Sequence, residues 1–342
     1  MLSREKKIAV ILAAHGEAES SGFLENYRVS RRTLRHAASV MEMPSFLQIG
    51  ISMISSLKKQ FKPAMFAGSP HNRIARDQAA RLQAFLDTLP GVSGYDFDVH
   101  AAYAASDPAV EEIIEATRGC DGQIILSMSP FDNELTCGQI CGYLAARGKE
   151  DELGRIKVVS RFWCDPALHE LCADHVSTES AAHGLSRSED NVLLLLYHGT
   201  LVRDTRGEVP GFRTGLHEAG FLADSLAKLI GADGRHPYGR VMTAFLNHDV
   251  GGTWTSPSFE DVGRLLRDSG AGNVALFAAG YFADGNETVG RERELRTVLK
   301  DSSIRTISCL NDSDAFIRYL GHKVAAAVSQ IMHLPFPSAD GS

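Results

Sequence analysis

The chain has 342 residues, of which 44% are hydrophobic and 23% charged, and this composition excludes a disordered, collagen-like or low-complexity protein. The length suits two domains, and a formal net charge of −7 makes nucleic acid an unexpected partner. Neither a signal peptide nor a run of about 18 apolar residues for a membrane helix occurs, so we expect a cytoplasmic protein.

The first predicted element is a buried strand over residues 8–14, which ends at His15. Short apolar runs of this kind, each followed by a longer amphipathic stretch, recur along the whole chain. This alternation is typical of α/β proteins with parallel sheets.

Three segments of the first half resemble three segments of the second half in the same order. The pairs are VILAAHGE (10–17) with LLLLYHGT (193–200), QIILSMSPFDNEL (123–135) with NVALFAAGYFADGNET (273–288), and IKVVSRFWCDPALHELCADHV (156–176) with IRTISCLNDSDAFIRYLGHKV (304–324). The repeated order indicates two structurally similar halves. We therefore predict domains at 1–176 and 191–330, a polar linker at 177–190 and a frayed tail at 331–342.

The repeats place chemically versatile side chains at the carboxyl ends of strands. His15 corresponds to His198, and Glu134 corresponds to Glu287. Ligands of open parallel sheets bind where these strand ends meet, so we expect the two halves to face each other across a central cleft that holds a small molecule.

His198 and Glu287 are the strongest candidates for chemistry. His198 follows five apolar residues, and a partly desolvated ring there favours a neutral imidazole that accepts a proton or ligates a metal. The alternative is a structural histidine bonded to loop backbone. Glu287 closes a glycine-containing turn and is expected to open a helix over 288–299, where a capping role is the alternative.

Other common catalytic patterns are missing from the sequence. No Walker phosphate loop and no GxGxxG fingerprint occurs, and no GxSxG elbow is present. Nucleotide binding and a serine-hydrolase mechanism are therefore not supported.

These motifs together resemble the ferrochelatases, which insert ferrous iron into a porphyrin in haem biosynthesis. LLLLYHGT resembles the strand that ends in His-Gly or His-Ser, and GYFADGNET is similar to the box Phe-x-x-Asp-x-x-Glu-Thr. AGSPHNRIARDQAARLQAFL (67–86), SPFDNELTCG and CLNDSDAFIRYL resemble further family segments, in the correct order from residue 8 to 324. The resemblance implies two Rossmann-like domains.

The resemblance also implies roles for individual residues. His198 and Glu287 would be catalytic and would bind the metal. His15 is not part of the family pattern, and we expect it as a further metal ligand because it lies at the equivalent strand end. The residues expected to bind the substrate are His15, Arg28, Ser69, Pro70, Arg73, Pro130 and Trp254, of which the two arginines are candidates for the porphyrin propionates on spacing alone. Ferrous iron is expected as a substrate, with no tightly bound cofactor and no iron-sulfur cluster. No integral membrane segment is expected, and peripheral contact with a membrane stays open.

The chain also departs from the family pattern. Acidic residues often follow the Glu at i+4 and i+8, whereas this chain has Arg291 and Leu295 there. His15 stands where relatives carry an apolar residue or a Tyr, and it is similar to the paired histidines of cobalt and sirohydrochlorin chelatases. A chelatase for another metal or tetrapyrrole, and a non-catalytic porphyrin or haem carrier, are therefore the alternatives to an iron chelatase.

Overall fold

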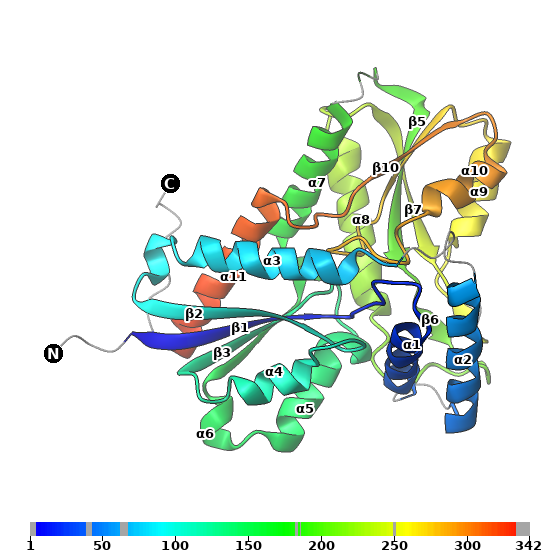
Figure 1. The fold of residues 1–342 in the computed structure, drawn as a ribbon. Coiled ribbons are helices and arrows are strands. Elements are labelled where there is room, and N and C mark those ends of the chain that lie inside the picture. Colours follow the sequence, from blue (N-terminus) through cyan, green and yellow to red (C-terminus); the bar gives the residue numbers. More distant parts are fainter. Residues whose placement is uncertain are drawn as a thin grey trace. The chain divides into compact units, whose positions relative to one another are not determined.

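The computed structural model describes residues 5–38, 43–61, 68–181, 184, 186–248 and 251–332 (Figure 1). The chain divides into two compact units, and each is described by itself. The first contains Met1–Met128, Leu135–Ser160 and Asp312–Ser342, and the second contains Ser129–Glu134 and Arg161–Asn311.

The first unit is built on a parallel sheet with the strand order β2-β1-β3-β4. Its strands are β1 (Lys6–Ala14), β2 (Tyr95–Tyr103), β3 (Gly122–Ser127) and β4 (Ile156–Val159). Its helices are α1 (Phe23–Ala37), α2 (Ser45–Phe61), α3 (His71–Leu86), α4 (Val110–Ala116), α5 (Gln139–Arg147), α6 (Glu150–Leu153) and α11 (Asp314–Ile331).

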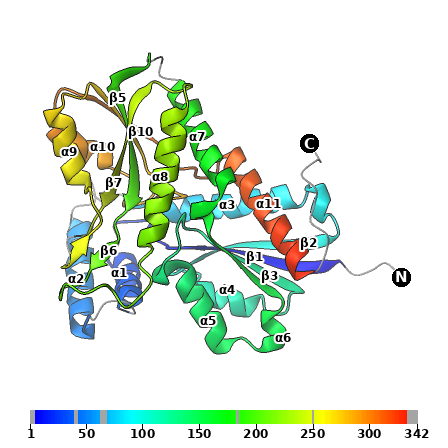
Figure 2. The ribbon, with the colours of Figure 1, turned by 180° about the vertical axis from the view of Figure 1, so that it is seen from behind.

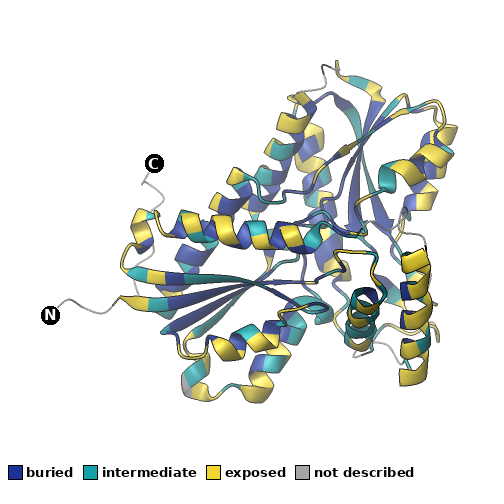
Figure 3. Ribbon diagram, in the orientation of Figure 1, coloured by how far each residue is buried: buried dark blue, intermediate teal, exposed yellow. Residues whose placement is uncertain are grey.

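Helices cover both faces of this first sheet. In Figure 1, α3 lies on one face of the sheet, and α4 and α5 lie on the other. Helix α11 packs beside α3 and against β3 and β4. Figure 3 shows the sheet as a buried layer, and residues 8–12 of β1 have no exposed surface. An uninterrupted apolar strand of this kind is what a sheet covered on both faces requires.

The second unit repeats this plan with the strand order β10-β9-β5-β7. Its sheet contains β5 (Ser188–His198), β7 (Tyr238–Leu246), β9 (Asn273–Phe277) and β10 (Ser303–Ile307), and a small antiparallel ribbon pairs β6 (Leu201–Arg203) with β8 (Thr253–Trp254). Its helices are α7 (Pro166–Ala181), α8 (Leu216–Ala232), α9 (Phe259–Asp268) and α10 (Arg291–Val298).

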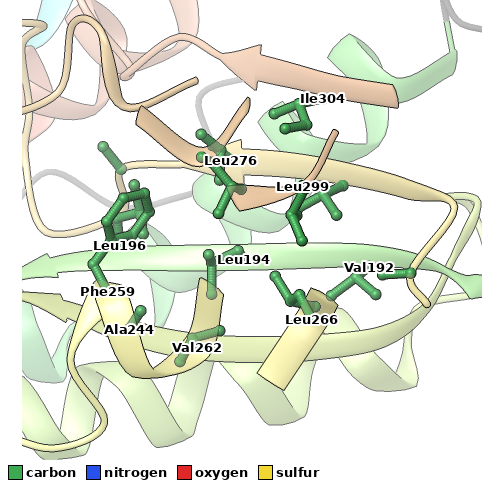
Figure 4. Packing of buried hydrophobic residues seen from close by; sticks show 14 of the residues in the cluster. Val192, Leu194, Leu196, Ala244, Phe259, Val262, Leu266, Leu276, Leu299 and Ile304 are labelled. Atoms are coloured by element: carbon green, nitrogen blue, oxygen red, sulfur yellow. The ribbon is translucent and has the colours of Figure 1, made fainter. Parts of the chain in front are cut away.

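The second sheet is also a buried middle layer. Helices α7 and α8 pack together on one face, as the reverse view in Figure 2 shows, and α9 and α10 cover the other face. Figure 4 shows the core under α9, where alternate side chains of β5 (Val192, Leu194 and Leu196) meet Val262 and Leu266. This core supports the strand that ends at His198.

The predicted α/β class with two similar halves is confirmed. Strand β1, which leads to His15, and strand β5, which ends at His198, are each an inner strand of their own sheet. The other strands also hold equivalent places in the two sheets: β2 corresponds to β7, β3 to β9, and β4 to β10. The central cleft would lie between the two units and stays a prediction.

The division into units differs from the predicted domain boundaries. Residues 161–176 belong to the second unit and not to the first, while residues 312–330 belong to the first. Each half therefore gives its last helix, α7 or α11, to the sheet of the other half. The linker at 177–190 is also corrected, because residues 177–181 continue α7 and residues 188–190 begin β5. Its polar Ser180 is buried and donates a hydrogen bond to the Tyr238 hydroxyl at 3.0 Å.

No helix among the described residues is long and apolar enough to cross a membrane.

Candidate functional site

Three potential metal ligands converge in the second unit: His198, His248 and Glu287. The Nε2 atoms of the two histidines lie 3.1 Å apart, and each lies 3.7 Å from Oε1 of Glu287. All three side chains are partly exposed, by 36%, 46% and 29% respectively. Among the described residues this is the one group of at least three such side chains within metal-binding distance.

His198 is positioned by the end of the central strand β5. Its Nδ1 lies 2.6 Å from the Gly199 carbonyl oxygen, which can only accept, so Nδ1 carries the proton. In the neutral ring the lone pair is then on Nε2, the atom that faces His248 and Glu287. A metal-ligating histidine is usually fixed in this way by a bond from its other nitrogen.

His248 is a site residue that the sequence analysis missed. It lies two residues beyond the end of β7, the neighbour of β5, in which Leu246 is in register with His198. Asn247 anchors this turn by donating to the Thr255 carbonyl oxygen at 2.9 Å. The one signal in the sequence is a histidine two residues after the strand-like run VMTAFL, and only the pairing of β5 with β7 gives it meaning.

Glu287 is held by a turn that follows β9. Asp284 organises this turn by accepting hydrogen bonds from the Asn311 amide at 2.8 Å and from the Thr288 hydroxyl at 3.2 Å. The predicted helix over 288–299 is corrected, because α10 begins at Arg291 after Gly290, which has a φ of 95°. Glu287 therefore precedes the helix and does not cap its first turn.

The two carboxylate oxygens of Glu287 have different neighbours. Oε1 faces the two histidines, and Oε2 accepts a hydrogen bond from the Tyr281 hydroxyl at 2.5 Å. Burial, with the nearby Glu287 carboxylate, raises the pKa of the Tyr281 phenol well above its usual value, so the phenol stays protonated and donates.

The three converging atoms have the spacing of a metal site. From their separations, a point equidistant from all three lies about 2.0 Å from each, which is the usual bond length from a divalent ion to imidazole nitrogen or carboxylate oxygen. Two histidines and one carboxylate form a set that suits divalent iron and leaves coordination positions open. Another molecule could bind the ion at those positions.

Arg291, the first residue of α10, contacts the backbone of Glu287. Its Nε donates to the Glu287 carbonyl oxygen at 2.7 Å, and its guanidinium pairs with Glu294 at 2.6 Å. Arg291 therefore holds the backbone of Glu287 through its carbonyl oxygen.

The predicted site residues of the first unit gather near the end of β1. His15 is exposed there, and its ring lies edge-on to that of His36 with 6.3 Å between the centroids. Ser69 is buried and donates to the Glu17 carboxylate. Pro70 caps α3.

The two predicted arginines of the first unit are both exposed. Arg28 lies on α1, and Arg73 lies on α3, where it pairs with Asp77 at 3.2 Å. Neither is held rigidly by buried partners, so their roles in substrate binding stay predictions.

The remaining predicted residues lie in the second unit. Trp254 of β8 is close to the cluster, because its ring meets the His248 ring edge-on with 5.5 Å between the centroids. Pro130 is buried. Glu134 donates its backbone N–H to the Arg213 carbonyl at 2.8 Å and is not part of the metal-ligand cluster.

Comparisons with known proteins point to one family. A family model described as Ferrochelatase matches residues 7–328. A protein named ferrochelatase from Cronobacter sakazakii is 24% identical over 260 residues, which cover 74% of this chain and 75% of that protein. The solved structure of SirB from Bacillus subtilis with Fe3+ matches with a TM-score of 0.54 at 13% identity, covering 97% of this chain and all of SirB, and it shows likeness of fold.

Proposed function

Because this chain belongs to the ferrochelatase family, we propose that it is a lyase that inserts ferrous iron into a porphyrin, protoporphyrin IX or coproporphyrin III. The observation that supports this most strongly is the convergence of His198, His248 and Glu287 on one point. Iron and the porphyrin are both substrates in this proposal, and no tightly bound cofactor takes part.

Metal insertion requires the protein to hold the ion and accept protons. The ion must lose water, and the ring must lose its two pyrrole protons as the metal–nitrogen bonds form. Nε2 of His198 carries the lone pair of the neutral ring, so it can bind the ion or accept a proton. The Glu287 carboxylate offers Oε1 beside it for the same tasks.

The proposal is tested by anaerobic incubation of the purified protein with ferrous iron and each porphyrin, following the porphyrin absorption bands. We expect turnover with the unchanged protein and none with His198→Ala. Porphyrin affinity of the variant should stay within about tenfold, or about 1.4 kcal/mol, of the parent.

A matched control is His175→Ala in the same unit. His175 lies on α7, packs against the Phe277 ring and is not part of the cluster, so this variant should retain turnover. Metallation by His198→Ala at the parent rate would contradict the catalytic assignment.

The same assay separates the alternatives. Turnover with cobalt or with sirohydrochlorin, and none with ferrous iron and porphyrin, would assign the site to another chelatase reaction. Tight porphyrin binding without metallation by any of these ions would assign it to a porphyrin or haem carrier.

We propose that His15 is an additional ligand for the iron of bound haem. The exposed position of the His15 ring at the end of β1 supports this proposal. Loss of an axial ligand changes the spin state of haem iron, so His15→Ala should shift the absorption bands of bound haem. Unchanged bands would leave His15 without this role.

We also propose that helix α2 makes peripheral contact with an anionic lipid surface. Its inner face carries polar residues, and Ser52 accepts a hydrogen bond from Ser30 of α1 at 3.1 Å. Large apolar side chains point outward instead, with Ile54 70% and Phe61 78% exposed, together with Phe46, Leu47, Ile49, Ile51, Met53 and Leu57. An apolar helix face of this kind suits the boundary between lipid headgroups and acyl chains.

The charge around α2 favours an anionic surface. Residues 23–61 contain six Lys and Arg against two Asp and Glu, although the whole chain is acidic. We expect flotation with vesicles of phosphatidylcholine and phosphatidylglycerol, and loss of flotation in Ile54→Glu. Leu265→Glu, on exposed helix α9 of the second unit, is the control. Failure of the parent to float, or dimerisation through α2 in solution, would overturn this contact.

A further inference from the structure

The hydroxyl of Tyr281 lies behind the metal-facing carboxylate. It donates to Oε2 of Glu287 at 2.5 Å, on the oxygen that does not face the histidines. The family box that this segment resembles has Phe at the same place, so the hydroxyl is a feature of this chain beyond that pattern.

We infer that Tyr281 is a positioning residue, which holds the Glu287 carboxylate so that Oε1 alone points at the metal bound by His198 and His248. This inference rests on the proposed function, because it assumes that the three side chains bind the metal substrate. The class of ligand is a divalent first-row metal ion.

The ring of Tyr281 is well placed for this role. It packs against the apolar core formed by β5, β9 and α9, so the direction of its hydroxyl is set by that packing. A carboxylate rotates freely about its last bond in the absence of partners. The hydrogen bond from a fixed phenol removes that freedom before the metal arrives.

The other end of Glu287 is fixed independently. Arg291 donates to its backbone carbonyl oxygen at 2.7 Å, and Arg291 is itself paired with Glu294. With the backbone held by Arg291 and Oε2 held by Tyr281, Oε1 is the carboxylate oxygen that faces the two histidines. The carboxylate is thus prepared as a monodentate ligand, and the metal keeps more positions open for pyrrole nitrogens.

A packing role and a positioning role predict different results for Tyr281→Phe. Phenylalanine keeps the ring and its core contacts, so a packing role leaves metal binding unchanged. Loss of the hydroxyl removes this hydrogen bond from Oε2, and a carboxylate that turns both oxygens to the metal then raises the coordination number of the metal. Removal of such outer hydrogen bonds typically weakens metal affinity by about 10- to 100-fold.

The experiment is titration of the protein with Co2+ alone, following the visible d–d absorption bands. We expect Tyr281→Phe to bind Co2+ at least about tenfold more weakly than the parent, with weaker bands because of the higher coordination number. The matched control is Tyr197→Phe. Tyr197 is adjacent to His198 and fully buried, and its hydroxyl has no hydrogen-bond partner among the described residues, so this variant should match the parent.

A double variant keeps the inference falsifiable. In the background of Glu287→Gln, the further change Tyr281→Phe should have no added effect on Co2+ affinity, because the ionised carboxylate is already gone. Equal Co2+ affinity and equal bands in the parent and Tyr281→Phe would overturn the inference while leaving the metal site intact. Failure of the parent to bind Co2+ would instead overturn the proposed metal site, and this inference with it.

Discussion

Replacement of Gly280 by alanine tests how closely the Glu287 turn packs against the strand that carries His198. A Cβ atom at this position would lie 2.8 Å from the Tyr197 Cα and 3.2 Å from the His198 nitrogen. Carbon atoms in favourable contact are about 3.5–4.0 Å apart, and here both neighbours are backbone that no side-chain rotation can move. The turn must shift, which strains the hydrogen bond of 2.9 Å from the Gly280 N–H to the Leu196 carbonyl.

The expected cost follows from these two contacts. Overpacking costs about 1–3 kcal/mol, and a lost backbone hydrogen bond costs about 1 kcal/mol, so Gly280→Ala should lower the free energy of unfolding by about 2–4 kcal/mol. For a unit of this size the melting midpoint should fall by at least about 4 °C. Co2+ affinity should fall as well, because Glu287 moves relative to His198.

Thermal unfolding followed by circular dichroism measures this effect. Gly263→Ala is the control in the same unit, because the nearest atom to its Cβ is Leu295 Cδ1 at an ordinary 3.4 Å and the residue lies inside α9. Alanine in a helix interior is favoured over glycine by about 1 kcal/mol, so this variant should keep or raise the midpoint. A Gly280→Ala protein that melts within about 1 °C of the parent would refute the close packing of the turn.

Substitutions at three further positions have expected outcomes. Gly68 has a φ of 96° and its Cβ would meet the Glu19 carbonyl oxygen, so Gly68→Ala should cost at least about 1–2 kcal/mol in urea unfolding, and an unchanged midpoint would exclude this conformation. Ser258 accepts from the Asp261 N–H at 3.1 Å at the start of α9, so Ser258→Ala should cost about 1 kcal/mol and Ser258→Gly clearly less. The Arg235 guanidinium lowers the pKa of Asp233 to about 2. Because this pKa is lower in the folded state, Asp233 stabilises the fold above the ordinary pKa of about 4 and loses this effect as the pH falls toward 2. The difference in melting midpoint between the parent and Asp233→Asn should therefore be constant above about pH 5 and shrink below pH 4, and a difference independent of pH would contradict the pairing.

The strands could be predicted from the sequence better than the partners of the helices. The run 193–197 is apolar at every position, which only a strand covered on both faces explains, and β5 lies in the centre of its sheet. The exchange of α7 and α11 between the units could not be predicted in this way. An amphipathic helix shows that it covers an apolar surface, but its sequence does not identify which of two similar sheets supplies that surface.

His248 illustrates why the metal-ligand set was incomplete at the level of sequence. The internal repeat led from His15 to His198, because β1 and β5 are equivalent strands. The equivalent of β7 is β2, which ends at Tyr103, so the repeat offers no second histidine to match. The position of His248 depends on the pairing of β5 with β7, and strand order is a property of the folded sheet that no local pattern contains.

The spacing of the three proposed metal ligands, His198, His248 and Glu287, is a consequence of the sheet itself. The three residues lie at or beyond the carboxyl ends of β7, β5 and β9, which are adjacent strands. The parallel register aligns His198 with Leu246 and Leu195 with Phe277. Hydrogen bonds of the sheet set the distances between these ends, and the turns after β7 and β9 add His248 and Glu287. Substitutions that shift one strand end, such as Gly280→Ala, should therefore weaken metal binding more than substitutions of equal cost on the outer face of α9.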